Sequence, residues 1–181
     1  MLGSIFMTAP LLLASALAAP GWGNWGQNWG PKGPAVPCLN DAEVSAIVAD
    51  YTYLLRFPQG ANFTSIANAR LSDKFFVSSD SINTLAGIPL GVNAYPSKQA
   101  FIGGQATTPA IPQLATLGYF YTCDQIAWRW NATAIGSGKY EVKGIITFDV
   151  NATTNQINAV YSEFNSAAWL SNIGNPECQK K

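Results

Sequence analysis

The feature of this chain that most constrains its fold is a change in hydrophobic period partway along the sequence. Between residues 40 and 57 the apolar residues recur every three or four positions, whereas from residue 126 onward they recur at every second position. A period near 3.6 is typical of a helix with one buried face, and a period of two is typical of a half-buried strand. The order therefore predicts an α+β fold in which helices cover one face of an antiparallel sheet.

The helical half opens with CLNDAEVSAIVADYTYLLRFP, residues 38–58. Asn40 followed three residues later by Glu43 is a variant of the capping-box signature, and Pro58 ends the pattern. One stripe holds the apolar residues Val44, Ile47, Val48, Tyr51, Leu54 and Leu55. A second helix is expected over 62–71, although Arg70 interrupts its stripe, and a third is expected after residue 96, ending at 103–104. Residues 75–77 read as a first strand, and 78–81 as a turn.

The second half of the chain reads as a meander of long strands. The segment LGYFYTCDQIAWRWNAT places Ile126, Trp128 and Trp130 on one face, with Arg129 on the other. KYEVKGIITFDV alternates in the same way, and INAVYSEFNSAAWL is expected to close the sheet. The segments between them, IGSGK and NATTNQ, have the composition of turns.

The N-terminal residues have a different character from the rest. The run MLGSIFMTAPLLLASALAA is apolar, too short to span a bilayer comfortably, and ends in the small-x-small pattern Ala-Leu-Ala. Residues 1–18 are therefore expected to be a cleaved secretory signal, with the lack of an early Lys or Arg as the one departure from that pattern. Residues 19–37 contain GWGNWGQNWG and fit neither period, which predicts a disordered leader before a single domain at 38–178.

The sequons support the prediction of secretion, and the cysteines are interpreted in its light. Three Asn-x-Thr sequons, at Asn62, Asn131 and Asn151, are candidate glycosylation sites on exposed turns, and a capping role for each asparagine is compatible with a glycan. The chain also holds three cysteines, so in an oxidising compartment two are expected to pair and one to remain.

The charged residues exclude several classes of function. Ten acidic residues balance ten basic ones, and the basic residues are scattered, so neither nucleic acid nor a membrane surface is an expected partner. The chain has no histidine, which removes Ser-His-Asp and Cys-His catalysis and His-ligated metals. The cysteine spacings fit no zinc motif, and we expect neither a metal nor a cofactor.

Several short motifs extend over nearly the whole domain. In chain order they are CLND (38–41), SDSINTL (79–85), SKQAFIGGQ (97–105), YTCD (121–124), WRW (128–130), KGIITFDV (143–150) and VYSEFNSAAWL (160–170). Together with the helix–strand order, they resemble the secreted fungal branch of the nuclear-transport-factor-two-like superfamily. The resemblance implies a cone: a curved antiparallel sheet wrapped by about three N-terminal helices around one apolar pocket. Relatives include polyketide cyclases, dehydratases, ketosteroid isomerases and binding domains, and some fungal members are linked to hetero-Diels–Alder cyclisation in secondary metabolism.

The chain departs from these relatives at two places. Tyr121 stands where relatives often have histidine, so a histidine-dependent mechanism does not carry over. The loop after SDSINTL lacks a cysteine that relatives often carry, which leaves an odd cysteine here. On this comparison Cys38–Cys123 is the favoured disulfide, with Cys38–Cys178 close behind.

Candidate site residues follow from the alternation. If the strand face of Asn131 is outside, Asp124 points into the cone with Trp128 and Trp130. Desolvation there would raise the pKa of Asp124 and suit it to general acid or base catalysis. A structural role in backbone bonding is the alternative. Glu163 is the second catalytic candidate.

The remaining candidates would bind a ligand. Tyr161 and Asn165 share a strand face with Glu163 and could hold a ligand oxygen, or simply be solvated. Tyr51 lies on the buried stripe of the first helix, so its hydroxyl needs a partner or the pocket. The two tryptophans are either pocket walls or core.

Two classes of function remain. The first is a secreted enzyme that binds a hydrophobic small molecule and acts as a cofactor-independent cyclase or pericyclase, a dehydratase or an isomerase. The second is a secreted binding or interaction protein without turnover. The oligomeric state stays open, with a homodimer among the options.

Overall fold

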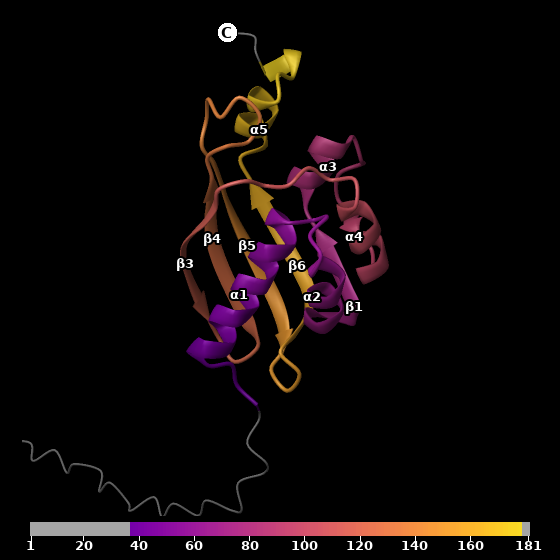
Figure 1. Cartoon of the computed structure of the whole chain (residues 1–181), viewed down its shortest axis with the longest axis vertical. Coiled ribbons are helices and arrows are strands. Elements are labelled where there is room, and N and C mark those ends of the chain that lie inside the picture. Colours follow the sequence, from indigo (N-terminus) through magenta and orange to yellow (C-terminus); the bar gives the residue numbers. More distant parts are fainter. Residues whose placement is uncertain (1–36, 179–181) are drawn as a thin grey trace, which may run out of the picture. The chain divides into compact units, whose positions relative to one another are not determined.

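The computed structural model describes residues 37–178, so the predicted signal peptide and all but the last residue of the predicted leader lie outside the described residues. The elements, in chain order, are α1 (Asp41–Arg56), α2 (Phe63–Arg70), β1 (Leu71–Ser78), α3 (Asp80–Ala86), β2 (Asn93–Tyr95), α4 (Lys98–Gln105), β3 (Leu114–Tyr121), β4 (Gln125–Ala132), β5 (Val142–Asn151), β6 (Gln156–Phe164), α5 (Ser166–Asn172) and a final 3-10 turn, Pro176–Cys178. Figure 1 shows α1 lying across one face of the sheet.

The six strands form one sheet in the order β2-β1-β6-β5-β4-β3. Strands β3 to β6 pair as the predicted antiparallel meander, and β2 pairs antiparallel with β1. The exception is β1, which runs parallel to β6, so the sheet is mixed rather than purely antiparallel. Because β1 follows the two N-terminal helices and lies beside the last strand of the meander, its direction is not set by a hairpin.

Helix α1 forms where the sequence predicts it. The Asn40 side chain accepts hydrogen bonds from the backbone N–H groups of Ala42 and Glu43, and the Glu43 carboxylate accepts one from the Asn40 N–H. This is the predicted capping box, and it satisfies backbone donors that the first helical turn cannot pair internally. The apolar stripe of the helix faces the sheet, and its buried residues are Val44, Ile47, Val48, Tyr51 and Leu54.

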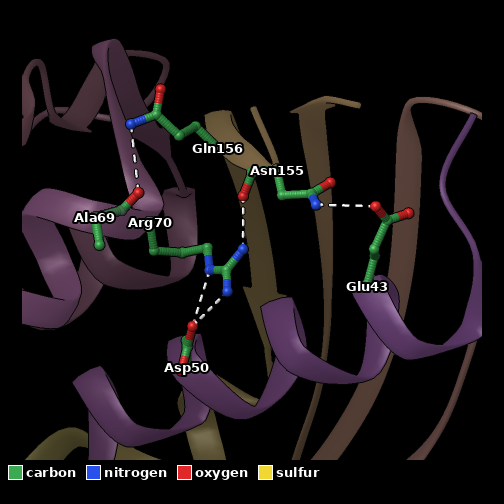
Figure 2. Close-up of polar contacts among 6 residues, drawn as sticks. All are labelled: Glu43, Asp50, Ala69, Arg70, Asn155 and Gln156. Carbon is green, nitrogen blue, oxygen red and sulfur yellow. Dashed lines mark hydrogen bonds and ion pairs between the residues drawn. The ribbon is translucent and has the colours of Figure 1, made fainter. Parts of the chain in front are cut away.

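The charged residue that interrupts the second helical stripe has a structural role. The Arg70 guanidinium donates from Nε and Nη2 to Asp50 Oδ2 on α1, at 2.9 and 2.5 Å, and from Nη1 to the backbone oxygen of Asn155, at 2.7 Å. Asn155 also donates to Glu43 through its side chain. Figure 2 shows this cluster, in which Arg70 joins α1 and α2 to the turn between β5 and β6.

The sequence does not predict α3, β2 or α5, and it misplaces some ends, since β1 begins at Leu71 rather than at residue 75. Residues 80–86 form α3, capped by Ser79, where a turn was expected, and β2 is a further short strand. The segment expected to close the sheet divides into β6 and α5, and α4 continues through Gly103 and Gly104 to Gln105. Helices α3 and α5 have seven residues each, fewer than two full turns, so a period of 3.6 hardly repeats in them.

The cysteine pairing is the favoured of the two alternatives. Cys38 and Cys123 form a disulfide, and Cys178 is free. The bridge joins the residues before α1 to the turn between β3 and β4, where the Leu39 N–H also donates to the Cys123 carbonyl at 3.1 Å. Among the described helices, none has the length and apolar character needed to cross a bilayer.

Candidate functional site

A cavity of about 670 Å³ lies between the helices and the sheet. Its walls come from α1, α3, α4 and α5, from strands β1, β4, β5 and β6, and from the loops at 107–112 and 134–136. Most of the lining is apolar, and the lining residues within 37–178 include no Asp, Glu, Lys or Arg. Volumes of a few hundred cubic ångströms and mostly apolar walls are typical of small-molecule sites.

Three neutral polar side chains stand out in this lining. Tyr51 from α1, Gln105 from α4 and Ser162 from β6 are only 2%, 4% and 5% exposed. Their hydroxyl and amide groups form no hydrogen bond within residues 37–178. Buried polar groups in proteins are nearly always paired with protein, water or ligand, so these three mark where a bound molecule could be held.

Tyr51 is the most enclosed of the three. Its ring lies 6.1 Å from the Phe101 ring and 5.0 Å from the Phe148 ring, between α4 and β5. Burial raises the pKa of the Tyr51 hydroxyl well above its ordinary value, and the nearby Tyr95 phenol raises this pKa further. Tyr51 is therefore a neutral phenol at any physiological pH, which makes it a hydrogen-bond donor and not a base.

Trp130 provides part of the sheet wall of the cavity. It is 2% exposed, and its indole N–H has no acceptor in the described chain. A Cβ at Gly144 on the adjacent strand would come within 2.5 Å of the indole, so only glycine lets Trp130 lie against β5. The Trp130 ring also contacts Phe164, which in turn contacts Trp169 of α5.

Trp128 belongs to the core rather than to the cavity wall. It is fully buried, stacks on Phe148 at 6.3 Å, and donates its indole N–H to Thr116 Oγ1 at 3.0 Å. Of the two alternatives given by the sequence, Trp130 is a pocket wall and Trp128 is core.

Asp124 lies outside the cavity, contrary to the sequence-based placement. It occupies the turn between β3 and β4 with an exposed side chain, accepts a hydrogen bond from the Thr122 hydroxyl, and accepts one from the Val150 N–H through its carbonyl. Strand β4 begins at Gln125, so the alternation that places Trp130 inward does not extend to Asp124. Within the described residues its carboxylate bonds the Thr122 hydroxyl and no backbone N–H, so the structural role in backbone bonding that the sequence left as the alternative is not one of the side chain either.

Glu163 and Tyr161 share a strand face, as predicted, but it is the face opposite Ser162 and the cavity. The Glu163 carboxylate accepts hydrogen bonds from the backbone N–H groups of Asp80 and Ser81 and from the Ser81 hydroxyl, so it holds the first turn of α3. Tyr161 is 44% exposed and contacts Phe76 edge-on.

Asn165 caps α5 instead of continuing the strand. Its side chain accepts a hydrogen bond from the Ala168 N–H. The structure therefore brings Tyr51 and Trp130 together in one cavity and leaves Asp124, Tyr161, Glu163 and Asn165 outside it.

Two of the polar cavity residues, Gln105 and Ser162, are not among the residues predicted from the sequence. Ser162 lies between Tyr161 and Glu163, so strand alternation places it on the face opposite to theirs, toward the cavity. Gln105 had a weaker signal: it follows Phe101 by one helical turn, but at the end of a glycine-containing helix.

The three sequons differ in their surroundings. Asn62 precedes α2 and Asn151 ends β5, and both are exposed. Asn131 is half-buried within β4, and its amide donates to Glu141. Glycosylation at all three positions stays a prediction.

Comparison with known proteins gives a family and a fold. A family model described as NTF2-like domain matches residues 37–176. A search of curated proteins finds no match. Among solved structures, IdmH, a proposed polyketide cyclase from Streptomyces antibioticus, aligns with a TM-score of 0.56 at 14% identity, over 72% of this chain and 98% of that one.

Two further solved structures have a similar fold. A proposed SnoaL-like polyketide cyclase from Jannaschia sp. aligns with a TM-score of 0.53 at 10% identity, over 81% of this chain and 99% of that one. A protein with a ketosteroid isomerase-like fold from Catenulispora acidiphila, solved in complex with trimethylamine, aligns with a TM-score of 0.53 at 12% identity, over 75% and 97%. At these identities the likeness establishes the fold and leaves the activity to the site.

Proposed function

Since this chain belongs to the NTF2-like domain family, we propose that it binds an uncharged, mostly apolar small molecule in the cavity and catalyses its cyclisation there. The observation that carries the proposal is a cavity of about 670 Å³ with no charged lining residue in the described chain. Four buried neutral polar side chains line it with groups that lack internal partners: Tyr51, Gln105, Ser162 and, through its indole N–H, Trp130. An ionised ligand would enter this cavity without a counter-charge, at a large desolvation cost.

The same lining favours one kind of chemistry. No carboxylate, lysine or histidine within residues 37–178 reaches the cavity, and Tyr51 is a phenol whose pKa is raised by burial, so proton abstraction by a lining residue is disfavoured. A pericyclic cyclisation such as a hetero-Diels–Alder reaction forms two σ bonds at the expense of two π bonds, transfers no proton, and needs no general base. Holding the reacting ends in a near-attack geometry can itself lower the barrier by several kcal/mol.

We propose further that the protein is secreted and acts in fungal secondary metabolism. This proposal is supported by the predicted signal at residues 1–18, by the resemblance to secreted fungal relatives, and by a disulfide between Cys38 and Cys123, which persists in an oxidising compartment. Binding without turnover is the second candidate, because the lining offers no acid–base residue and the same neutral walls would serve a carrier equally well.

A charge-selection experiment tests the binding proposal. Nile red is a neutral apolar dye whose fluorescence rises in apolar surroundings, and 1-anilinonaphthalene-8-sulfonate is an anionic dye with the same property. We expect Nile red to bind with one-to-one stoichiometry and the anionic dye to bind at least about ten-fold more weakly, since its sulfonate would lose its hydration without gaining a partner. Equal or tighter binding of the anionic dye would contradict the proposal.

Turnover separates the two candidates. A substrate that carries a tethered heterodiene and alkene cyclises slowly in buffer, so the enzyme candidate predicts a faster rate in the presence of the protein. The carrier candidate predicts binding of the same molecule with the uncatalysed rate unchanged.

A further inference from the structure

The cavity opens to solvent at one end of the domain. Some of its lining residues are themselves exposed and so mark the opening: Ala86 at the end of α3, most of the loop at 107–112, Gly136 between β4 and β5, and Ile173 after α5. Figure 1 shows α3, α5 and the loop between β4 and β5 at the same end of the domain. A molecule that enters the cavity therefore passes these segments.

The surface around this opening is apolar. The loop that follows α3 exposes Leu90 at 65% and Val92 at 46%, and Ile173 is 55% exposed. We name the exposed apolar residues of this surface the mouth rim: Ala86, Leu90, Val92, Pro109, Ala110 and Ile173. No Asp, Glu, Lys or Arg occurs in the four sequence segments around the opening, which are residues 81–97, 99–123, 130–138 and 164–176.

The turn that carries Leu90 and Val92 is fixed to α3. The Asp80 carboxylate accepts a hydrogen bond from the Gly91 N–H at 2.7 Å, and the Asn83 amide donates to the Val92 carbonyl at 2.8 Å. Gly91 has a φ of 80°, a left-handed conformation that favours glycine. The exposure of the two apolar side chains is therefore built into the turn, and exposed apolar surface of this kind marks an interaction site.

An aromatic ring and a cation lie at the border of the mouth rim. The Asn172 side chain, next to Ile173, accepts a hydrogen bond from the Tyr140 N–H at 2.9 Å and donates one to the Tyr140 carbonyl at 2.7 Å. Tyr140 is 44% exposed, and the Lys139 ammonium lies 5.0 Å from the centroid of its ring. Tyrosine and lysine beside an apolar surface are typical of the boundary between lipid and water, where the ammonium complements lipid phosphate.

We propose that the mouth rim docks on a lipid bilayer with neutral headgroups: its aliphatic side chains enter the bilayer surface, and Tyr140 and Lys139 lie at the headgroup level. The expectation of no membrane partner rests on charge alone. Scattered basic residues disfavour attraction to an anionic membrane, but the insertion of uncharged side chains needs no net charge.

Lipid fits the mouth rim better than a second copy of this chain does. A second copy seated on the rim would cover the opening of the cavity, and Lys139 of each copy would meet an uncharged surface. A lipid surface offers phosphate groups to Lys139 and hydrocarbon to the rim. The inference goes beyond the proposed function, which it would serve by letting an apolar ligand pass from lipid to the cavity without crossing water.

Flotation with phosphatidylcholine vesicles tests the docking, and the bound fraction at increasing lipid concentration gives a partition coefficient. Leu90→Asp should lower this coefficient by about ten-fold or more, because a charge replaces an aliphatic side chain that enters the bilayer. The matched control is Phe120→Asp, since Phe120 is also 65% exposed but lies near the end of β3 and outside the cavity lining. It should stay within about two-fold of wild type.

Two further measurements accompany the flotation. The wild-type coefficient should change by less than about two-fold between low and high salt, since charge does not drive the docking. Leu90→Asp should keep its melting temperature and its Nile red affinity in lipid-free buffer, because the replaced side chain is exposed and does not line the cavity.

The outcomes distinguish this inference from the proposed function. Failure of the wild-type protein to float with the vesicles, or a loss of flotation in Phe120→Asp but not in Leu90→Asp, would overturn the docking, while Nile red binding in lipid-free buffer would leave the proposed function standing. Sedimentation velocity without lipid tests the other occupant. A dimer that Leu90→Asp dissociates would assign the mouth rim to a second copy and overturn the lipid assignment.

Discussion

Replacing both Cys38 and Cys123 by serine removes a cross-link between residues 85 positions apart in the sequence. In the chain-entropy model, a closed loop of that length restricts the unfolded chain by about 4.6 kcal/mol at 25 °C. The native state should change little, because the Leu39 N–H still donates to the residue 123 carbonyl and the Tyr121 hydroxyl still donates to Asp41 at 2.5 Å. We therefore expect the free energy of unfolding to fall by about 4 to 5 kcal/mol.

Urea denaturation followed by tryptophan fluorescence measures this loss. With a slope of about 2 kcal/mol/M, typical for a domain of this size, the midpoint should fall by roughly 2 M. The double variant is preferred to Cys38→Ser alone, since a lone Cys123 could pair with Cys178. Cys178→Ser is the matched control and should unfold at the wild-type midpoint, because Cys178 is free. A loss below about 1 kcal/mol in the double variant would refute the argument from loop entropy.

Two further predictions concern side chains that join elements outside the cavity. Asp50→Ala should destabilise the fold by about 1 to 2 kcal/mol, more than Arg70→Met, because it leaves a guanidinium that is only 16% exposed without its carboxylate partner, whereas Asp50 is 37% exposed and can be solvated. Chemical denaturation of both variants checks the order, and a larger loss for Arg70→Met would contradict it. Glu163→Ala should speed hydrogen exchange at the Asp80 and Ser81 amides, because both donate to the Glu163 carboxylate. It should also weaken Nile red binding several-fold, because α3 supplies part of the cavity wall, and Glu163→Gln should be intermediate in both. Unchanged exchange would show that the carboxylate does not hold the helix.

Long elements were predictable from this sequence because their periods repeat. The sixteen residues of α1 contain the stripe and the capping box that define it, and the ten residues of β5 alternate as expected, with Ile146, Phe148 and Val150 buried. The short helices α3 and α5 carry too few repeats, and their N-caps, Ser79 and Asn165, fit turns equally well.

The candidate site was predictable only where a residue lies within a long element. Tyr51 lies in the middle of α1 and Trp130 in β4, and both reach the cavity. Asp124 failed because alternation stops at a turn, and Glu163 because the inward phase of β6 belongs to Ser162. The burial of Gln105 depends on how α4 docks against Tyr51 and Tyr95, which is tertiary information that no local pattern holds.

The cavity can be blocked from one position on β5 while the adjacent position serves as its control. Ile146 is 2% exposed and lines the cavity, whereas Ile145 is 42% exposed on the other face, where it borders a smaller groove of about 300 Å³ beside Phe120. Phenylalanine at position 146 would fill part of the ligand space, and the same substitution at 145 would leave that space intact.

The Nile red titration of these two variants tests directly whether the cavity holds the ligand. We expect Ile146→Phe to weaken binding by about ten-fold or more and Ile145→Phe to stay within about two-fold of wild type. The reverse order would place the dye in the groove beside Phe120 and show that the cavity is not the binding site.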